Sequence, residues 1–174
     1  SALSGGQKQR VCIARALAAE PELMICDEVT SALDPLVAEE ILRLLRKLQD
    51  ELGLTYLFIS HDMSVVRHMS DRIAVMYLGR IVEEGDTEEL FARPRHPYTQ
   101  LLLQTIPNIE SPNRDRTPEG GEVPSPLKPP SGCTFHPRCP LAQARCKVEV
   151  PQVRTLSNNT RVACHLVEDE TVPA

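Results

Sequence analysis

Two short apolar runs separated by a helix-like stretch constrain the fold of this chain more than any other feature. The runs are residues 23–26 and 54–59, and continuous apolar runs of this length are typical of strands buried on both faces of a parallel sheet. Between them, Asp34 and Pro35 form a typical helix start, and Gly53 forms a typical helix end. The strand–helix–strand order predicts an α/β fold with a mostly parallel sheet.

Polar side chains follow both predicted strands. Asp27 and Glu28 come directly after the first strand, and Ser60, His61 and Asp62 follow the second. Ligands of open α/β sheets bind at the carboxyl ends of the strands, where two adjacent carboxylates are costly unless a cation or a substrate engages them. One carboxylate can hold a hydrated Mg²⁺ while its neighbour orients or deprotonates a water. The alternative for the two acids is a turn in which both are solvated. A lone histidine in a turn is usually structural, but the position of His61 beside the carboxylate pair makes it a candidate contact to phosphate or water.

The first helical pattern begins with Ser4, Gly5, Gly6 and Gln7. Ser4 and Gln7 have the capping-box spacing, in which the hydroxyl and the amide satisfy free N–H groups at the helix start. The two glycines remove side chains where another group could approach the backbone. A capped, glycine-rich helix start is a natural phosphate site, and a plain helix cap without a ligand is the alternative.

A tight hairpin is predicted after the second strand. Residues 72–77 and 80–83 are strand-like, and Leu78 and Gly79 between them are typical of a two-residue turn.

Charge and hydropathy exclude several classes of protein. The chain has 24 acidic and 19 basic residues, a net charge of −5, which argues against a free-standing nucleic-acid binder because phosphate neutralisation needs a basic face. No apolar run approaches the roughly 20 residues of a transmembrane helix. The composition is otherwise that of an ordinary globular protein.

Proline divides the chain into two parts. Of the 15 prolines, 13 lie at or after Pro94. We therefore expect a compact α/β part over residues 1–92 and a loop-rich part over residues 93–174. Residues 107–130 hold seven prolines and few large apolar side chains, which predicts an extended linker.

Several segments in fixed order resemble ABC-type ATPases. They are Leu3-Ser4-Gly5-Gly6-Gln7 (signature motif), Leu23-Met24-Ile25-Cys26-Asp27-Glu28 (Walker B strand), Ser31-Ala32-Leu33-Asp34 (D-loop) and His61 (switch histidine). Residues 71–83 and His96-Pro97-Tyr98-Thr99 are similar to the oligopeptide/dipeptide/nickel importer branch. The resemblance covers essentially the whole chain and implies the C-terminal half of an ABC ATPase P-loop domain followed by a small cysteine-containing tail.

The resemblance implies a role for each candidate site residue. Asp27 would hold Mg²⁺ directly or through water, Glu28 would be the general base or orient the water, and His61 would contact the γ-phosphate. The segment 4–7 would cover the γ-phosphate of ATP bound to the opposite subunit. Asp34 would communicate across the dimer.

The chain contains no G-x-x-x-x-G-K-[ST] motif, whose backbone and lysine cradle nucleotide phosphates. By the resemblance, we expect these 174 residues to be the C-terminal portion of a longer subunit and to be inactive alone. The full subunit would be an ATPase that powers the uptake of peptides.

The resemblance also implies partners and a location. A second, identical or homologous ABC ATPase subunit, two membrane permease subunits and an extracytoplasmic substrate-binding protein are expected, without nucleic acid. The subunit would lie peripherally on the cytoplasmic face of the membrane. Two other classes stay open: a DNA-repair ABC ATPase, which would need zinc-type cysteine pairs and a more basic surface, and a metal-binding module on a non-catalytic ABC scaffold.

Four cysteines mark the tail: Cys133, Cys139, Cys146 and Cys164. A cytoplasmic location disfavours disulfides, so four thiolates suggest a metal centre. Zinc sites usually contain a C-x₂₋₄-C pair, which these spacings lack, and wider spacing fits an iron–sulfur cluster at least as well. Similar tails in the importer branch are associated with a [4Fe–4S] cluster. Zinc and unliganded thiols are the alternatives.

Overall fold

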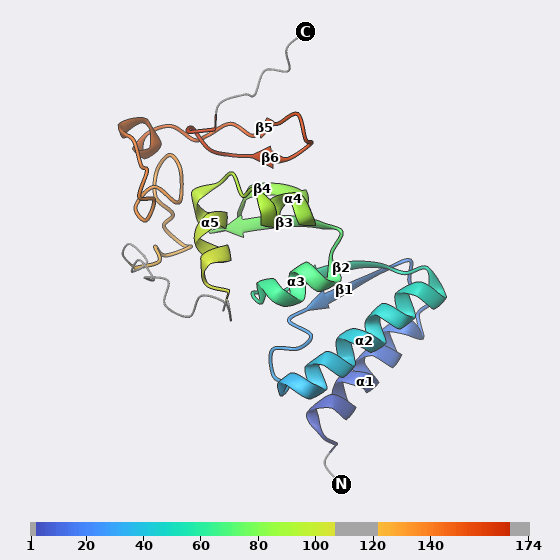
Figure 1. Ribbon diagram of the computed structural model, residues 1–174. Coiled ribbons are helices and arrows are strands. Elements are labelled where there is room, and N and C mark those ends of the chain that lie inside the picture. The colour runs from blue at the N-terminus through green and yellow to red at the C-terminus, as the bar shows by residue number, and fades with distance from the viewer. Residues whose placement is uncertain (1–2, 107–121, 168–174) are drawn as a thin grey trace. The chain divides into compact units, whose positions relative to one another are not determined.

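The computed structural model describes residues 3–106 and 122–167, and the chain divides into two compact units (Figure 1). We call Ser1–Ser70 the N-terminal unit and Asp71–Ala174 the C-terminal unit. Residues 107–121 of the predicted linker lie outside the described residues. The division at Ser70/Asp71 puts the hairpin in the same unit as the tail, and the boundary proposed at residues 92/93 stays a prediction. In the described part of the chain, no helix is long and apolar enough to cross a bilayer.

The N-terminal unit contains the strand–helix–strand arrangement that the apolar runs predict. Its elements are α1 (Gly5–Leu17), β1 (Leu23–Asp27), α2 (Pro35–Leu52), β2 (Thr55–Ile59) and α3 (Met63–Met69). Strands β1 and β2 pair in parallel, with Leu23 opposite Thr55 and Asp27 opposite Ile59. The two carboxyl ends therefore lie next to each other.

Local sequence signals fix the ends of the helices. The Ser4 Oγ accepts from the Gln7 N–H at 3.2 Å, and the Ser4 N–H donates to the Gln7 Oε1 at 2.9 Å, which confirms the capping box. Asp34 caps α2 by accepting from the Val37 N–H at 3.1 Å. Gly53 ends α2 with φ of +66°, a left-handed conformation that glycine adopts without steric cost.

The three helices of the N-terminal unit share one apolar cluster. Its buried members are Ile13 from α1, Met24 and Cys26 from β1, Ile41, Leu42 and Leu45 from α2, Leu54 before β2, and Met69 from α3. Helices α1 and α2 approach so closely at Gly6 that an added Cβ would lie 2.6 Å from Val37 Cγ1. The core of this unit therefore lies on one face of the β1–β2 pair.

The prediction that these strands are buried on both faces is wrong for the described residues. Met24 and Cys26 of β1 are buried, whereas Leu23 and Ile25 are 52% and 62% exposed. Alternate side chains of a strand point to opposite faces, so helices packed on one face leave every second side chain uncovered. Leu57 of β2, 50% exposed, is uncovered in the same way.

The C-terminal unit is built on an antiparallel sheet with the strand order β3-β4-β6-β5. Its elements are β3 (Arg72–Tyr77), β4 (Arg80–Asp86), α4 (Thr87–Ala92), α5 (Pro97–Gln104), the 3₁₀ helix η1 (Ala144–Lys147), β5 (Arg154–Thr155) and β6 (Arg161–Val162). The predicted hairpin is confirmed, because Tyr77 pairs with Arg80 across Leu78 and Gly79, both with positive φ. The predicted parallel pairing is found in the N-terminal unit, between β1 and β2, whereas the sheet of the C-terminal unit is antiparallel.

Buried contacts join the cysteine-bearing tail to the hairpin. Phe135 is 1% exposed, and its ring centroid lies 5.2 Å from that of Tyr77 and 5.3 Å from that of Tyr98.

A buried carboxylate joins β4 to the start of α5. The fully buried Glu83 carboxylate accepts from the N–H groups of Arg95 and His96 at 2.7 and 2.9 Å. These bonds satisfy a charge that would otherwise be costly to bury.

Replacing Leu45 with alanine should destabilise the protein. Leu45 is fully buried in α2, so Leu45→Ala should lower the free energy of unfolding by about 2–5 kcal/mol through lost burial and a residual cavity. Leu36→Ala is the matched control, because Leu36 lies on the same helix and is 77% exposed; its effect should stay within about 0.5 kcal/mol. Urea unfolding measures both, and equal losses would contradict the assigned core.

Candidate functional site

A carboxylate and an imidazole meet where β1 and β2 end. His61 Nδ1 lies 2.8 Å from Glu28 Oε1. Both side chains are accessible, with 78% of the His61 side chain and 41% of the Glu28 side chain exposed. Because a carboxylate accepts, Nδ1 carries the proton of this hydrogen bond and Nε2 is left for another partner. Sequence analysis named both residues as candidates, and the structure brings them together.

The parallel pairing and one unusual turn produce this contact. The Glu28 N–H donates to the Ile59 carbonyl at 2.9 Å, which continues the β1–β2 ladder one residue beyond the strand. Glu28 then adopts φ of +49°, in the left-handed region. For a residue with a Cβ, that conformation costs about 1–2 kcal/mol. Backbone strain of this kind is frequent at functional sites, and in the described residues Glu20, Leu78 and Asn159 also have positive φ.

The electrostatics of the pair favour a charged imidazole. The hydrogen bond to Glu28 raises the pKa of His61 above its usual value, and the charge of Glu28 and, to a smaller degree, that of Asp62 act in the same direction. Asp62 itself caps α3, accepting from the Ser64 N–H at 2.9 Å and the Val65 N–H at 3.3 Å. Its bond with the Ser64 side chain is the largest cause that lowers the pKa of Asp62.

The pair borders a pocket of about 370 Å³ in the N-terminal unit. Most of the polar lining comes from the two strand-end turns, with Glu28, Thr30 and Ser31 on one side and Ser60, His61 and Asp62 on the other, and α2 adds Glu39. A water or a phosphate oxygen in this pocket can contact both the Glu28 carboxylate, an acceptor, and the His61 imidazole, a donor, and these two groups are already hydrogen-bonded to each other. That arrangement suits general base catalysis or the orientation of a water.

The other residues named from the sequence lie around this pair in different ways. Asp27 is the exposed last residue of β1 and directly precedes Glu28. Asp34 uses one carboxylate oxygen to cap α2. The α1 start lies near the segment before α2, since a Cβ on Gly5 would lie 3.2 Å from Leu33 Cδ2. In this structure, the polar side chains of segment 4–7 bond to that segment's own backbone. The roles implied for these residues stay predictions.

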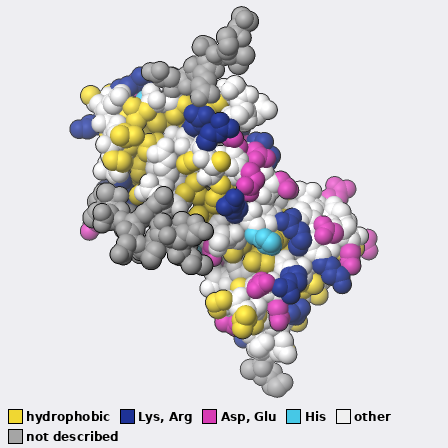
Figure 2. All heavy atoms as spheres, in the orientation of Figure 1, with side chains coloured by type: hydrophobic (Ala, Val, Ile, Leu, Met, Phe, Trp, Pro, Cys, Tyr) yellow, Lys and Arg dark blue, Asp and Glu magenta, His cyan; other side chains and the backbone are white. Residues whose placement is uncertain are grey.

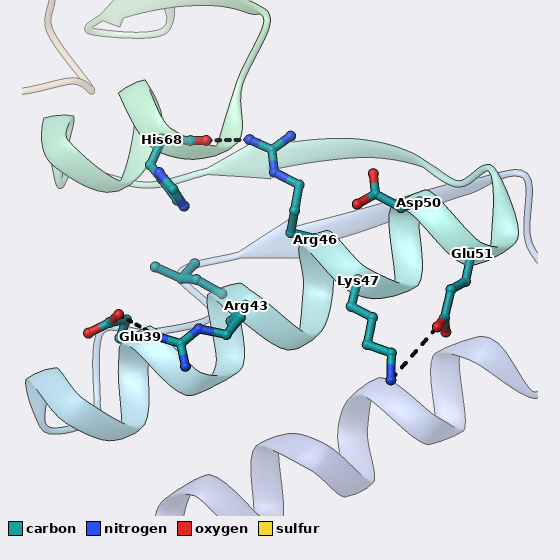
Figure 3. Close-up of a pocket in the computed structure, with 8 residues that line it drawn as sticks. Glu39, Arg43, Arg46, Lys47, Asp50, Glu51 and His68 are labelled. Carbon is teal, nitrogen blue, oxygen red and sulfur yellow. Dashed lines mark hydrogen bonds and ion pairs between the residues drawn. The ribbon is translucent and has the colours of Figure 1, made fainter.

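A larger hollow of about 660 Å³ runs along α2 and α3 (Figure 3). Four of its charged side chains form ion pairs within the protein: Arg43 with Glu39 at 2.7 Å and Lys47 with Glu51 at 3.7 Å. Arg46 donates to the carbonyl of His68. Figure 2 likewise shows acidic and basic side chains interspersed over this unit. We assign the site to the smaller pocket because it holds the carboxylate–histidine pair.

The four tail cysteines lie near one another. Burial is the largest cause that raises the pKa values of Cys133, Cys139 and Cys164, and the charges of neighbouring cysteines raise them further. The Cys146 Sγ accepts from the Gln143 N–H, and the Cys164 Sγ from the Leu166 N–H, each at 3.5 Å.

This geometry does not support the predicted iron–sulfur or zinc site. Within residues 3–106 and 122–167, no three His, Cys, Asp or Glu side chains are grouped as metal ligands.

Sequence analysis missed two contributors to the site. Ser31 was placed in the D-loop without a role, although it is hydrogen-bonded to the Glu28 carbonyl. Asp62 was named only as a polar neighbour of His61. Its position two residues before Ser64, at the start of a helical segment, is an N-cap signal that could have identified it.

Comparison with known proteins assigns the chain to a family. Residues 1–31 match the model of the ABC transporter family, and residues 82–146 match that of the oligopeptide/dipeptide transporter C-terminal region. The chain is 55% identical to the "Probable peptide ABC transporter ATP-binding protein y4tS" of Sinorhizobium fredii over 95% of its length and 47% of the relative's. It is 51% identical to the "Oligopeptide transport ATP-binding protein AppF" of Bacillus subtilis over 94% and 50%. It is 48% identical to the "Dipeptide transport ATP-binding protein DppF" of Haemophilus influenzae over 95% and 51%.

The chain thus spans about half the length of the curated relatives that it matches. These relatives are named for peptide transport, so the DNA-repair class and the non-catalytic metal-binding class are not supported. The chain belongs to the ABC transporter ATP-binding proteins, in the branch that carries the oligopeptide/dipeptide transporter C-terminal region.

Proposed function

We propose that this chain supplies the hydrolytic carboxylate–histidine pair of an ATPase subunit that powers peptide import. The observation that carries the proposal is the 2.8 Å hydrogen bond between Glu28 and His61 at the ends of two parallel strands. The names of the relatives support peptides as the class of cargo.

Each residue of the pair has a distinct task in this proposal. Glu28 accepts a hydrogen bond from the attacking water and orients it, or takes its proton, toward the terminal phosphate of ATP. His61 holds Glu28 through Nδ1 and offers Nε2 to a phosphate oxygen. Protonated His61 adds positive charge near the phosphate, where negative charge develops in the transition state.

The remaining candidate residues have supporting tasks. Asp27 is an exposed carboxylate beside Glu28, and its hard oxygen atoms suit Mg²⁺, which would neutralise phosphate charge during the transfer. Segment 4–7 begins a helix whose N–H groups can bind the γ-phosphate of ATP held by a second subunit. Asp34, the N-cap of α2, would transmit contact across the dimer.

The assembly follows from the same proposal. We expect a second ATP-binding subunit, two membrane permease subunits and an extracytoplasmic substrate-binding protein as partners. The subunit would lie peripherally on the cytoplasmic face of the membrane. The net charge of −5 supports an assembly without nucleic acid.

We also propose that the tail cysteines bind an iron–sulfur cluster, with Zn²⁺ as the alternative metal. The support is that four thiols, the preferred ligands of both, are close enough to influence one another's pKa. N–H donors to two of the sulfurs would stabilise the thiolate forms. The thiols would have to close in on the metal, because no metal-ligand group is present in the described residues.

Replacing the Glu28 carboxylate should abolish most of the ATPase activity of the full-length subunit in its importer. Glu28→Gln should lower kcat by about 10²–10⁴-fold, the usual contribution of a general base, while MgATP binding persists. Glu22→Gln is the matched control, because Glu22 is exposed just before the start of the same strand. Phosphate release and nucleotide binding are the measurements. Full activity of Glu28→Gln would contradict the proposed role.

The protonation of His61 should depend on Glu28. Because Glu28 raises the pKa of His61, the imidazole holds its proton to higher pH than a free histidine does and releases it as pH rises through that raised pKa. In Glu28→Gln, the pKa of His61 should fall, whereas Glu22→Gln should leave it unchanged. NMR titration of the imidazole resonances measures this, and an unchanged pKa in Glu28→Gln would show that the hydrogen bond does not form in solution.

Metal analysis tests the tail. After anaerobic purification of the full-length subunit, we expect about four irons with matching sulfide per chain, the content of a [4Fe–4S] cluster. Cys164→Ser should lose the iron, and Cys12→Ser, which changes an exposed cysteine of α1, should keep it. One zinc per chain would favour the alternative metal, and a metal-free protein with four titratable tail thiols would refute both.

A further inference from the structure

The backbone of Glu28 is anchored on both sides of its side chain. On one side, the Glu28 N–H donates to the Ile59 carbonyl of β2 at 2.9 Å. On the other side, the Glu28 carbonyl accepts two hydrogen bonds, and both come from Ser31. Between these anchors, φ of Glu28 is +49°. The direction of its side chain therefore depends on bonds that keep an unfavourable backbone conformation in place.

Ser31 contributes one backbone and one side-chain bond to this carbonyl. The Ser31 N–H lies 3.1 Å from the Glu28 oxygen and closes the turn of residues 28–31. The Ser31 Oγ lies 3.0 Å from the same oxygen. A carbonyl oxygen has two lone pairs, so both bonds can form at once. The hydroxyl is the part of this arrangement that a substitution can remove without changing the backbone.

We propose that Ser31 is a positioning residue for Glu28, and that its hydroxyl holds the carboxylate at the distance from His61 and from the attacking water that hydrolysis requires. The inference rests on the proposed function of Glu28. It assigns Ser31 no contact with substrate. Its effect passes through the turn that connects the two residues.

The surroundings of Ser31 argue against a role in packing. Ser31 is exposed and lies outside the apolar cluster of its unit. Glu28, the residue that it holds, is also exposed, whereas Val29 between them packs against the apolar cluster and keeps the turn attached to the core. Loss of the hydroxyl should therefore leave the fold intact and let Glu28 relax toward more favourable backbone angles. Small displacements of a group that orients a reacting water reduce rates strongly.

The first experiment measures MgATP hydrolysis by the full-length subunit assembled in its importer. Ser31→Ala should lower kcat about tenfold or more, with the KM for MgATP within about twofold of the parent value. Ser31→Thr keeps a hydroxyl at the same position and should restore most of the activity. Thr55→Ala is the matched control, because it removes an exposed hydroxyl at the opposite end of β2, outside the pocket that holds Glu28. It should behave as the parent protein does.

A second experiment combines Ser31→Ala with Glu28→Gln. If Ser31 acts through Glu28, the double variant should be no slower than Glu28→Gln alone, measured in single turnovers. A purely structural effect of Ser31→Ala would add to that of Glu28→Gln and would not be rescued by threonine.

Three outcomes separate the inference from the function on which it rests. A normal kcat in Ser31→Ala, with Glu28→Gln inactive, overturns the inference and leaves the proposed function standing. A loss that threonine does not rescue, or that adds fully to Glu28→Gln, also overturns it. Parent-like activity of Glu28→Gln contradicts the proposed function, and with it the inference.

Discussion

The parallel pairing of β1 with β2 is the interaction on which the candidate site depends. The ladder holds Asp27 opposite Ile59, and the Glu28 N–H extends it one residue further. A slip of one residue would turn every side chain of a strand to the opposite face, so the buried cluster beneath one face fixes the register. Because of this register, the loop that contains Glu28 lies beside the loop that contains His61. A set of apolar contacts under the sheet thereby determines the distance between two polar groups at its edge.

Features that obey rules within a few residues could be predicted from the sequence. The capping box of Ser4 and Gln7, the Asp34 cap and the Gly53 end of α2 each depend on groups close together along the chain. The turn at Leu78 follows in the same way from the glycine after it. The strand–helix–strand order of residues 23–59 could also be predicted, because apolar runs and helix caps alternate plainly there.

Features that depend on distant contacts could not be predicted. An apolar run does not say whether helices cover one face of a strand or both, so the exposure of Ile25 came only from the structure. The burial of Glu83 depends on backbone groups twelve and thirteen residues away, and that of Phe135 on rings about forty and sixty residues away. The positive φ of Glu28 has no local signal, because glutamate usually avoids that region. The Glu28–His61 pair was predicted as two separate candidates, and only the register joins them.

The uncovered face of the β1–β2 pair has a practical consequence for work with this chain. Leu23, Ile25, Leu57 and Ile59 are all about half exposed or more and project from neighbouring strands, so they form one apolar stripe. Contiguous apolar surface of this kind promotes association unless something covers it. We therefore expect the 174 residues, when produced alone, to need detergent, a solubility tag or low concentration to stay monodisperse. Their colloidal behaviour would reflect this stripe more than the net negative charge.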